Sequence, residues 1–176
     1  MFSFLLAFFA SVREKKGMSD TLVLRSATIA DAPALAATIA ASFEQYRGKL
    51  VPESGAFGET ADTIASQLRN GAGAIVAERN DRMLACVMTE TRGGDLYFGR
   101  LAVLPEARGL GLAGRLIAAV EAEARRRGLP GVRLGVRVVL TENQRLFGSL
   151  GYVETSREPH PGFTYPTSIN MRKALE

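Results

Sequence analysis

The sequence has few of the residue types that build covalent or metal-bound frameworks. Its 176 residues include one cysteine, one histidine and no tryptophan. A single cysteine excludes an intramolecular disulfide and suits a reducing compartment. One histidine excludes a histidine cluster and any Cys/His zinc spacing, so we expect no metal site. Cys86 lies in an apolar run and is expected to be a small core hydrophobe.

The sequence also has no apolar run of the roughly 20 residues that a transmembrane helix needs. The most apolar stretch, residues 2–12, is short, and basic residues follow it at Arg13, Lys15 and Lys16. A secretory signal has its positive charge before the apolar stretch. We therefore expect a cytoplasmic protein with no stable membrane insertion, in which residues 1–17 are a non-essential extension and residues 18–176 form the domain. A weak membrane-surface anchor at residues 1–17 is the alternative.

A strong charge imbalance is absent as well. The formal net charge is +4, from 22 basic and 18 acidic residues. No dense Lys/Arg stripe interleaved with aromatic residues occurs, and such a stripe is what nucleic-acid binding requires. The mild basic excess is compatible with an anionic ligand or simply with solubility. We expect no nucleic-acid partner.

What is present is the composition of one globular domain, 47% hydrophobic and 23% charged. Hydrophobic periodicity, caps and turn residues predict an alternation of strands and helices. The predicted strands are 21–27, 73–78, 82–91, 95–103, 132–138, 152–157 and 167–172; the predicted helices are 32–43, 59–69, a long helix ending at 127, and 141–150 with a capping box at its start. This order predicts an α/β fold of the α+β type, with helices packed on a largely antiparallel sheet.

A glycine turn lies between the strand 95–103 and the long helix, with the sequence Arg-Gly-Leu-Gly-Leu-Ala at residues 108–113. Glycines let the backbone approach a phosphate, and the first amides of a helix point at an anion there. No Gly-Lys-Ser/Thr follows, so the turn is not a Walker loop. The third glycine and the acidic strand end of a dinucleotide fingerprint are missing too. A helix that merely begins after a flexible turn is the alternative.

The turn and its surroundings resemble the Gcn5-related N-acetyltransferase (GNAT) superfamily. The family signature, Arg/Gln-x-x-Gly-x-Gly/Ala after a strand ending in Val-x-Pro, is similar to residues 101–113 position by position. A second landmark is an Asn, an aromatic residue four positions on, and a Leu-Gly-aromatic triplet; Asn143, Phe147 and residues 150–152 supply it. The resemblance covers residues 21–175. It implies a central, mixed, mostly antiparallel seven-stranded sheet flanked by about four helices, and acetyl transfer from acetyl-CoA to a primary amine.

The resemblance also implies which residues hold the cofactor. The turn amides would bind the pyrophosphate, the strand before it would hydrogen-bond the pantetheine like an added strand, and the next helix would flank the pantetheine arm. The residues in these roles are Arg108, Gly109, Leu110, Gly111, Leu112, Ala113 and Gly114 for the pyrophosphate, Leu101, Ala102 and Val103 for the strand, and Asn143 and Phe147 for the helix. One amide of that strand would polarise the thioester carbonyl.

The acid–base residues are less clear from the sequence. Many family members have a tyrosine that protonates the leaving thiolate, and the matching position here is Phe147, which has no proton to give. Tyr152 and Tyr165 are candidates by residue type only, and a structural role is the alternative for both. Candidates for the base that deprotonates the amine are Glu53, Glu59, Glu90 and His160, and each can equally be an ordinary solvated side chain. Arg100 can face either side of its strand.

Three functions therefore stay open at this stage. The first is an N-acetyltransferase acting on a small amine or a peptide. The second is a catalytically weak acyl-CoA-binding domain with a regulatory role, which Phe147 suggests. The third is a generic phosphate or nucleotide module. The segment 43–58, which should shape the acceptor pocket, mixes basic, acidic and aromatic residues and identifies no acceptor. A homodimer is possible.

Overall fold

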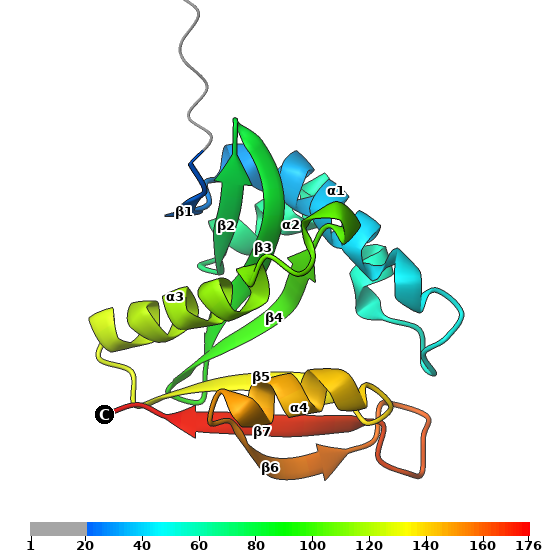
Figure 1. Cartoon of the computed structure of the whole chain (residues 1–176). Coiled ribbons are helices and arrows are strands. Elements are labelled where there is room, and N and C mark those ends of the chain that lie inside the picture. The colour runs from blue at the N-terminus through cyan, green and yellow to red at the C-terminus, as the bar shows by residue number, and fades with distance from the viewer. Residues whose placement is uncertain (1–20) are drawn as a thin grey trace, which may run out of the picture.

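A computed structural model describes residues 21–176, so the predicted extension 1–17 lies outside the described residues. Helices and strands alternate as predicted (Figure 1). The strands are β1 (Val23–Ser26), β2 (Gly73–Arg79), β3 (Arg82–Arg92), β4 (Asp95–Val103), β5 (Gly131–Arg137), β6 (Val153–Glu158) and β7 (Ser168–Ala174). The α-helices are α1 (Ala32–Phe43), α2 (Ala61–Arg69), α3 (Leu112–Arg126) and α4 (Thr141–Ser149). Short 3-10 turns include Glu44–Tyr46 and Gly55–Gly58.

The seven strands form one sheet in the order β1-β2-β3-β4-β5-β7-β6. Within the described chain β4 and β5 pair in parallel and every other neighbouring pair is antiparallel. The predicted seven-stranded, mostly antiparallel sheet with four helices is therefore confirmed. The helix α3 connects β4 to β5, as a parallel pair requires a crossover.

The sheet opens between its two halves (Figure 1). Strands β4 and β5 pair only over Leu96–Phe98 and Val132–Leu134, and beyond these residues they diverge. A buried carboxylate holds the closed end: Asp95 on β4 accepts hydrogen bonds from Arg133 on β5 and Arg172 on β7, at 2.5 and 2.7 Å. These arginines, Arg172 first, lower the pKa of Asp95. The strands β4 and β5 are therefore held together at Asp95 and diverge from there.

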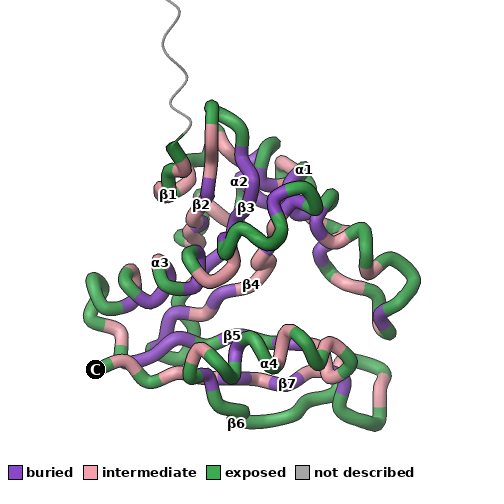
Figure 2. The backbone as a smooth tube through the Cα atoms, viewed as in Figure 1, coloured by how far each residue is buried: buried purple, intermediate pink, exposed green. Residues whose placement is uncertain are grey.

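Apolar side chains form one core on each face of the sheet. Figure 2 shows the buried stretches, in purple, along the strands and along α3. Leu116, Ile117 and Val120 of α3 pack on one face together with Phe147 of α4. On the other face, Leu35 and Ile39 of α1 pack with residues of α2 and of the strands β2 to β4. The apolar stripe of α3 is thus buried. The edge strand β6 is exposed along its whole length.

One local prediction is wrong. The capping box expected at the start of α4 is not formed, because Leu140 rather than Thr141 is the N-cap and no side chain caps the helix there. Gln144 instead donates hydrogen bonds from its amide nitrogen to the carbonyls of Arg137 and Val138, at 3.1 and 2.7 Å. The side chain satisfies carbonyls at the end of β5 and fixes α4 beside the opening of the sheet.

None of the helices within residues 21–176 combines the length and the apolar character needed to cross a membrane.

Candidate active site

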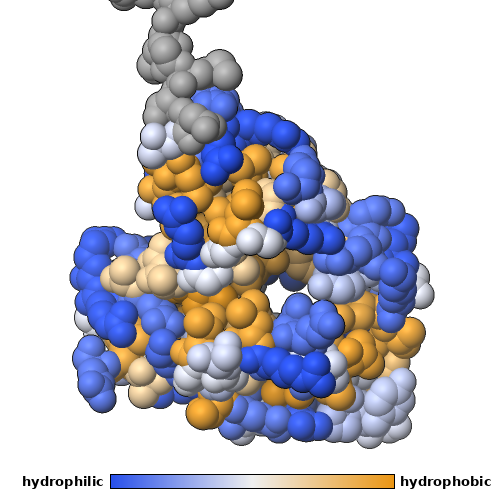
Figure 3. Space-filling model, in the orientation of Figure 1, coloured by the Kyte–Doolittle hydropathy of each residue, from blue (hydrophilic) through white to orange (hydrophobic). Residues whose placement is uncertain are grey.

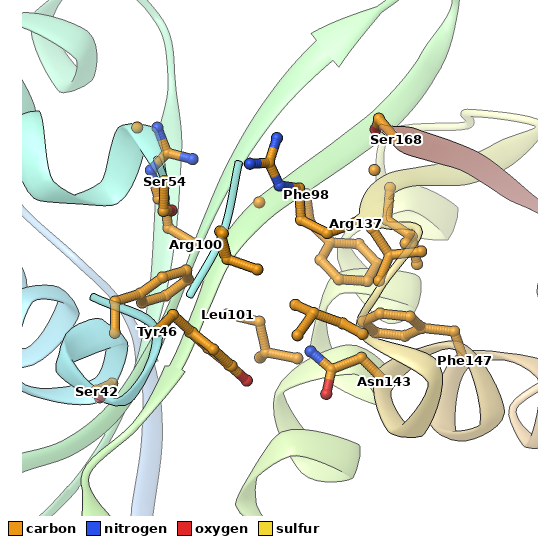
Figure 4. A pocket seen from close by; sticks show the side chains of 18 of the residues that line it. Ser42, Tyr46, Ser54, Phe98, Arg100, Leu101, Arg137, Asn143, Phe147 and Ser168 are labelled. Carbon is orange, nitrogen blue, oxygen red and sulfur yellow. The ribbon is translucent and has the colours of Figure 1, made fainter. Parts of the chain in front are cut away.

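A cavity of about 630 Å³ lies where β4 and β5 diverge. The space-filling view shows the hollow between the two halves of the molecule (Figure 3). Its walls come from β4, β5, α4, the end of α1 with the segment after it, the glycine turn with the start of α3, and the β6–β7 connection around His160 with the start of β7. Figure 4 shows Arg100 and Arg137 pointing into the end that holds Ser54 and Ser168, whereas Tyr46 and Asn143 lie toward the other end.

The glycine turn lies between β4 and α3, and Arg108 and Ala113 of this segment reach the cavity. Gly109 and Gly111 have φ angles of +79° and +70°, and Gly111 is the N-cap of α3. Open space surrounds the Cβ position of both, so glycine is needed here for backbone conformation rather than for packing. The turn therefore presents the unpaired first amides of a 15-residue helix to solvent.

Arg108 fixes the turn to the opposite wall. Its guanidinium donates a hydrogen bond to the carbonyl of Ser42 at the end of α1, at 3.3 Å. The Ser42 hydroxyl is buried, lines the cavity and has no partner within the described residues. A polar, cationic corner thus lies at the turn end of the cavity, where an anion can be bound.

Strand β4 has a bulge next to the cavity. Cys86 and Met88 of β3 face Ala102 and Gly99 of β4, so β4 carries one extra residue between them. Arg100 occupies this bulge with a φ angle of +50°, which is unusual for a residue other than glycine. Because β4 is not paired with β5 beyond Phe98, its backbone groups after this point are available to a ligand.

Arg100 is held on one side by a carboxylate. Its Nε donates to Glu59 at 2.9 Å, and Glu59 also accepts from Gln67 at 3.0 Å. Arg100 contacts both the cavity and a second depression on the outer side of β4. Glu59, a candidate base, is therefore engaged with Arg100 and does not line the main cavity.

The wall from α4 carries Asn143 and Phe147, as the spacing of the sequence predicts. Phe147 is buried and packs edge to face on Phe98 and Tyr152, with ring centroids 6.0 and 6.3 Å apart. The Phe147 ring forms a hydrophobic part of the cavity wall, and this position carries no hydroxyl group.

The structure places three other candidates away from the cavity. The Tyr152 hydroxyl is buried and donates to Glu121 at 3.1 Å, and Lys173 also donates to Glu121, at 2.9 Å. Burial, foremost, and the Glu121 charge raise the pKa of Tyr152 far above its usual range. Glu90 lies on the outer side of β3 in an ion pair with Arg92. Tyr165 is exposed and packs edge to face on Phe163.

Glu53 and His160 do line the cavity, on two different loops. Both ring nitrogens of His160 lie within 3.0 Å of Arg137 Nη1, and Nδ1 also contacts the Thr167 hydroxyl. Burial and the Arg137 charge, in that order, lower the pKa of His160. The imidazole is therefore neutral at pH 7, and it accepts a hydrogen bond from Arg137.

The cavity residues that were not candidates in the sequence include three polar ones of interest: Ser42, Tyr46 and Arg137. Tyr46 lies in the turn after α1, opposite Asn143 and Phe147, and its hydroxyl has no partner in the described part of the chain (Figure 4). Nothing in the local pattern distinguishes these residues, because each reaches the cavity through contacts far apart in the sequence. A polar residue in a loop of unknown path gives no signal of its direction.

A comparison with protein-family models matches residues 39–152 to the acetyltransferase (GNAT) family. The matched segment contains α2, all of the strands β2 to β5, and the helices α3 and α4. It therefore spans both the glycine turn and the α4 wall of the cavity.

Solved structures share the fold at low sequence identity. The PaiA N-acetyltransferase from Thermoplasma acidophilum, in complex with coenzyme A, has 15% identity and a TM-score of 0.71, over 88% of this chain and 99% of that one. The ribosomal-protein-S18-alanine N-acetyltransferase from Escherichia coli has 20% identity and a TM-score of 0.68, over 88% and 93% of the two chains. The yncA protein from Salmonella typhimurium, with acetyl-CoA, has 19% identity and a TM-score of 0.65, over 88% and 94%. No curated protein sequence matches the chain.

Proposed function

The chain belongs to the acetyltransferase (GNAT) family, and from this premise we propose that it transfers an acetyl group from acetyl-CoA to a primary amine of a small molecule or peptide. The observation that carries the proposal is the cavity between β4 and β5, which joins an anion-binding turn at one end to a polar pocket at the other. Solved structures of the same fold bind coenzyme A or acetyl-CoA. We expect donor and acceptor to meet inside this cavity.

The glycine turn is the proposed pyrophosphate site. The amides from Arg108 to Ala113, with Gly114 in the first helical turn, would donate to the pyrophosphate, and the positive end of the α3 dipole would favour its negative charge. Arg108 adds a cation beside them. Leu101, Ala102 and Val103 would bind the pantetheine arm as an added strand, and Asn143 and Phe147 would cover it from α4.

Acetyl-CoA supplies the activated acetyl group, and the protein's part is to orient, deprotonate and protonate. The bulge at Arg100 and Leu101 lies on the part of β4 that is not paired with β5. An amide there would donate to the carbonyl oxygen as it gains negative charge, a kind of stabilisation that is large in a water-poor site. As the amine nitrogen bonds to the acetyl carbon, the bond to sulfur breaks, and the products are an amide and coenzyme A.

The acceptor must lose a proton before it can attack, since an alkylamine is mostly protonated near pH 7. Among the predicted bases, Glu53 and His160 line the cavity, but the imidazole of His160 accepts from Arg137. Glu53 is exposed at the cavity wall, where solvent can carry the proton away. We assign the base role to Glu53, acting directly or through a water molecule.

The leaving thiolate takes up a proton, and Phe147 cannot give one. Tyr46 presents a phenol to the same cavity from the wall opposite Phe147. We assign the acid role to Tyr46: its proton passes to sulfur, and the phenolate takes a proton from solvent afterwards. A thiolate leaves readily near neutral pH, so this role accelerates turnover rather than permitting it.

Release of coenzyme A thiol in the presence of amines tests the proposal. The purified chain is incubated with acetyl-CoA and with amino acids, aminoglycosides, polyamines or peptides, and thiol is followed with a chromogenic disulfide reagent. We expect thiol release that depends on one class of amine, and acetylated product by mass spectrometry.

Ligand binding to the same purified chain distinguishes the two other functions. Tight acetyl-CoA binding without thiol release for any amine would favour an acyl-CoA-binding domain, which the buried hydroxyl-free ring of Phe147 would suit. Stabilisation by ATP or NAD equal to that by coenzyme A, measured as a thermal shift, would instead favour a general nucleotide module.

A further inference from the structure

The end of the cavity away from the glycine turn contains a guanidinium that no carboxylate within residues 21–176 pairs with. Arg137, the last residue of β5, lines the cavity and is half-buried. Its Nη1 contacts the His160 ring and its Nη2 donates to the carbonyl of Pro52. Both partners are uncharged, because the pKa of His160 is lowered. Desolvation of this kind is costly for a cation and also lowers the pKa of Arg137.

The other charged groups of the cavity are accounted for. Arg100 is paired with Glu59, and Arg108 lies by the glycine turn, at the opposite end. Glu53 is exposed. Its charge helps to raise the pKa of Arg47, which lies outside the cavity and whose pKa is raised mainly by Glu44. The positive charge of Arg137 is therefore left for a ligand.

The two partners of Arg137 come from the two loops that frame this end. Pro52 lies in the connection between α1 and α2, and His160 in the connection between β6 and β7, where its backbone amide also donates to Thr167 at 2.9 Å. A planar guanidinium fixed by two uncharged acceptors keeps remaining donors in a fixed direction. Ser168 also lines this end and can add a hydroxyl (Figure 4).

We propose that Arg137 is the carboxylate-binding residue of the acceptor site, so that the amine accepted by this enzyme carries a carboxylate near the reacting nitrogen, as a free amino acid does. The proposal rests on the proposed acetyl transfer and specifies its acceptor. Glu53 follows Pro52 in the chain and would face the ammonium group of the same ligand. Guanidinium and carboxylate form strong paired hydrogen bonds, which suits recognition of a small zwitterion.

Matched acceptors test this assignment. Each L-amino acid is compared with its own primary amide at saturating acetyl-CoA, because the pair differs in the carboxylate and shares the side chain. The amide is also the less basic amine of the pair, so it is measured across pH and compared as its neutral form. We expect kcat/KM to be at least about tenfold higher for the acid, the factor that a charge-assisted hydrogen bond gives.

The variant Arg137→Gln should reduce this ratio to near one, and Arg137→Lys should restore part of it. The control is Arg133→Gln, on the same strand but outside the cavity, where Arg133 binds Asp95. The ratio is measured on one protein sample, so a loss of folded protein cancels from it. The KM for acetyl-CoA should stay unchanged in all three variants.

Three results would overturn the assignment: equal rates for acid and amide in the parent chain, an unchanged ratio in Arg137→Gln, or a raised KM for acetyl-CoA in that variant. The last would place Arg137 on the donor. Failure of acetyl transfer itself is a different outcome, since no amine of either kind would then release thiol. Binding of N-acetyl amino acids, measured by calorimetry, checks the subsite without turnover and should weaken about tenfold in Arg137→Gln.

Discussion

The two ends of the cavity are built in different ways. The turn end consists of backbone conformation within a few consecutive residues, with Gly109 and Gly111 at positive φ before α3. The loop end consists of side chains from segments far apart, with Arg137 of β5 against Pro52 and His160. A site made of backbone tolerates side-chain change but not a change of φ. A site made of side chains has the opposite sensitivity.

The largest effect is expected from breaking the turn end by Gly111→Val. A branched residue is strained at a φ of +70°, so the amides of the turn, the proposed pyrophosphate site, move. We expect the affinity for acetyl-CoA, measured by calorimetry, to fall about 100-fold. Gly128→Val is the matched control, because Gly128 has a φ of +68° and open space at the other end of α3. An equal loss in both variants would attribute the effect to strain in the helix and not to the turn.

A smaller effect is expected in the middle of the cavity, from Tyr46→Phe. Removal of the phenolic proton should lower kcat by about ten- to a hundredfold with little change in the KM for acetyl-CoA. Tyr165→Phe removes a hydroxyl from an exposed tyrosine outside the cavity and should leave the rate unchanged. A Tyr46→Phe variant with full kcat would show that solvent protonates the thiolate.

The support of β4 next to the loop end is tested by Glu59→Gln. The ion pair with Arg100 is partly buried, with the Glu59 side chain 10% exposed, so its loss should cost about 1 kcal/mol of unfolding free energy. The pair between Glu44 and Arg47 is on the surface, and Glu44→Gln should leave stability unchanged. Urea denaturation of both variants measures the difference. Equal stability of the two would mean that the Arg100 bulge needs no carboxylate.

The smallest effect concerns pH at the loop end. Because the pKa of His160 is lowered from its ordinary 6.5, the unfolded chain binds this proton more readily than the folded one. The stability due to the neutral imidazole is complete above pH 6.5 and is lost as the pH falls below that value. His160→Gln keeps an acceptor for Arg137 but does not titrate.

Thermal unfolding of the parent chain and of His160→Gln, measured from pH 8 to pH 5, tests this. The melting temperature of the parent should fall relative to the variant as the pH passes below 6.5. A constant difference across this range would contradict a neutral, partly buried His160.

The sequence predicts well what depends on neighbours in the chain. Strands and helices follow from periodicity and turn residues, and the order of elements yields the seven-stranded sheet. The expected capping box at Thr141 is absent. The side chain of Gln144 donates instead to the carbonyls of Arg137, at the end of β5, and of Val138. Tyr152 looked like a candidate acid by residue type, but its hydroxyl is buried against Glu121.

The glycine turn and the family were thus determined by the sequence alone, because both depend on residues at short and fixed spacings. The acceptor end was decided by the tertiary structure. The divergence of β4 and β5, fixed at Asp95, brings Tyr46, Glu53, Arg137 and His160 to one cavity from three separate segments. Whether a charge is neutralised depends on which groups pack against it. The groups packed against Arg137 are the His160 ring and the Pro52 carbonyl, so its charge is available to a ligand.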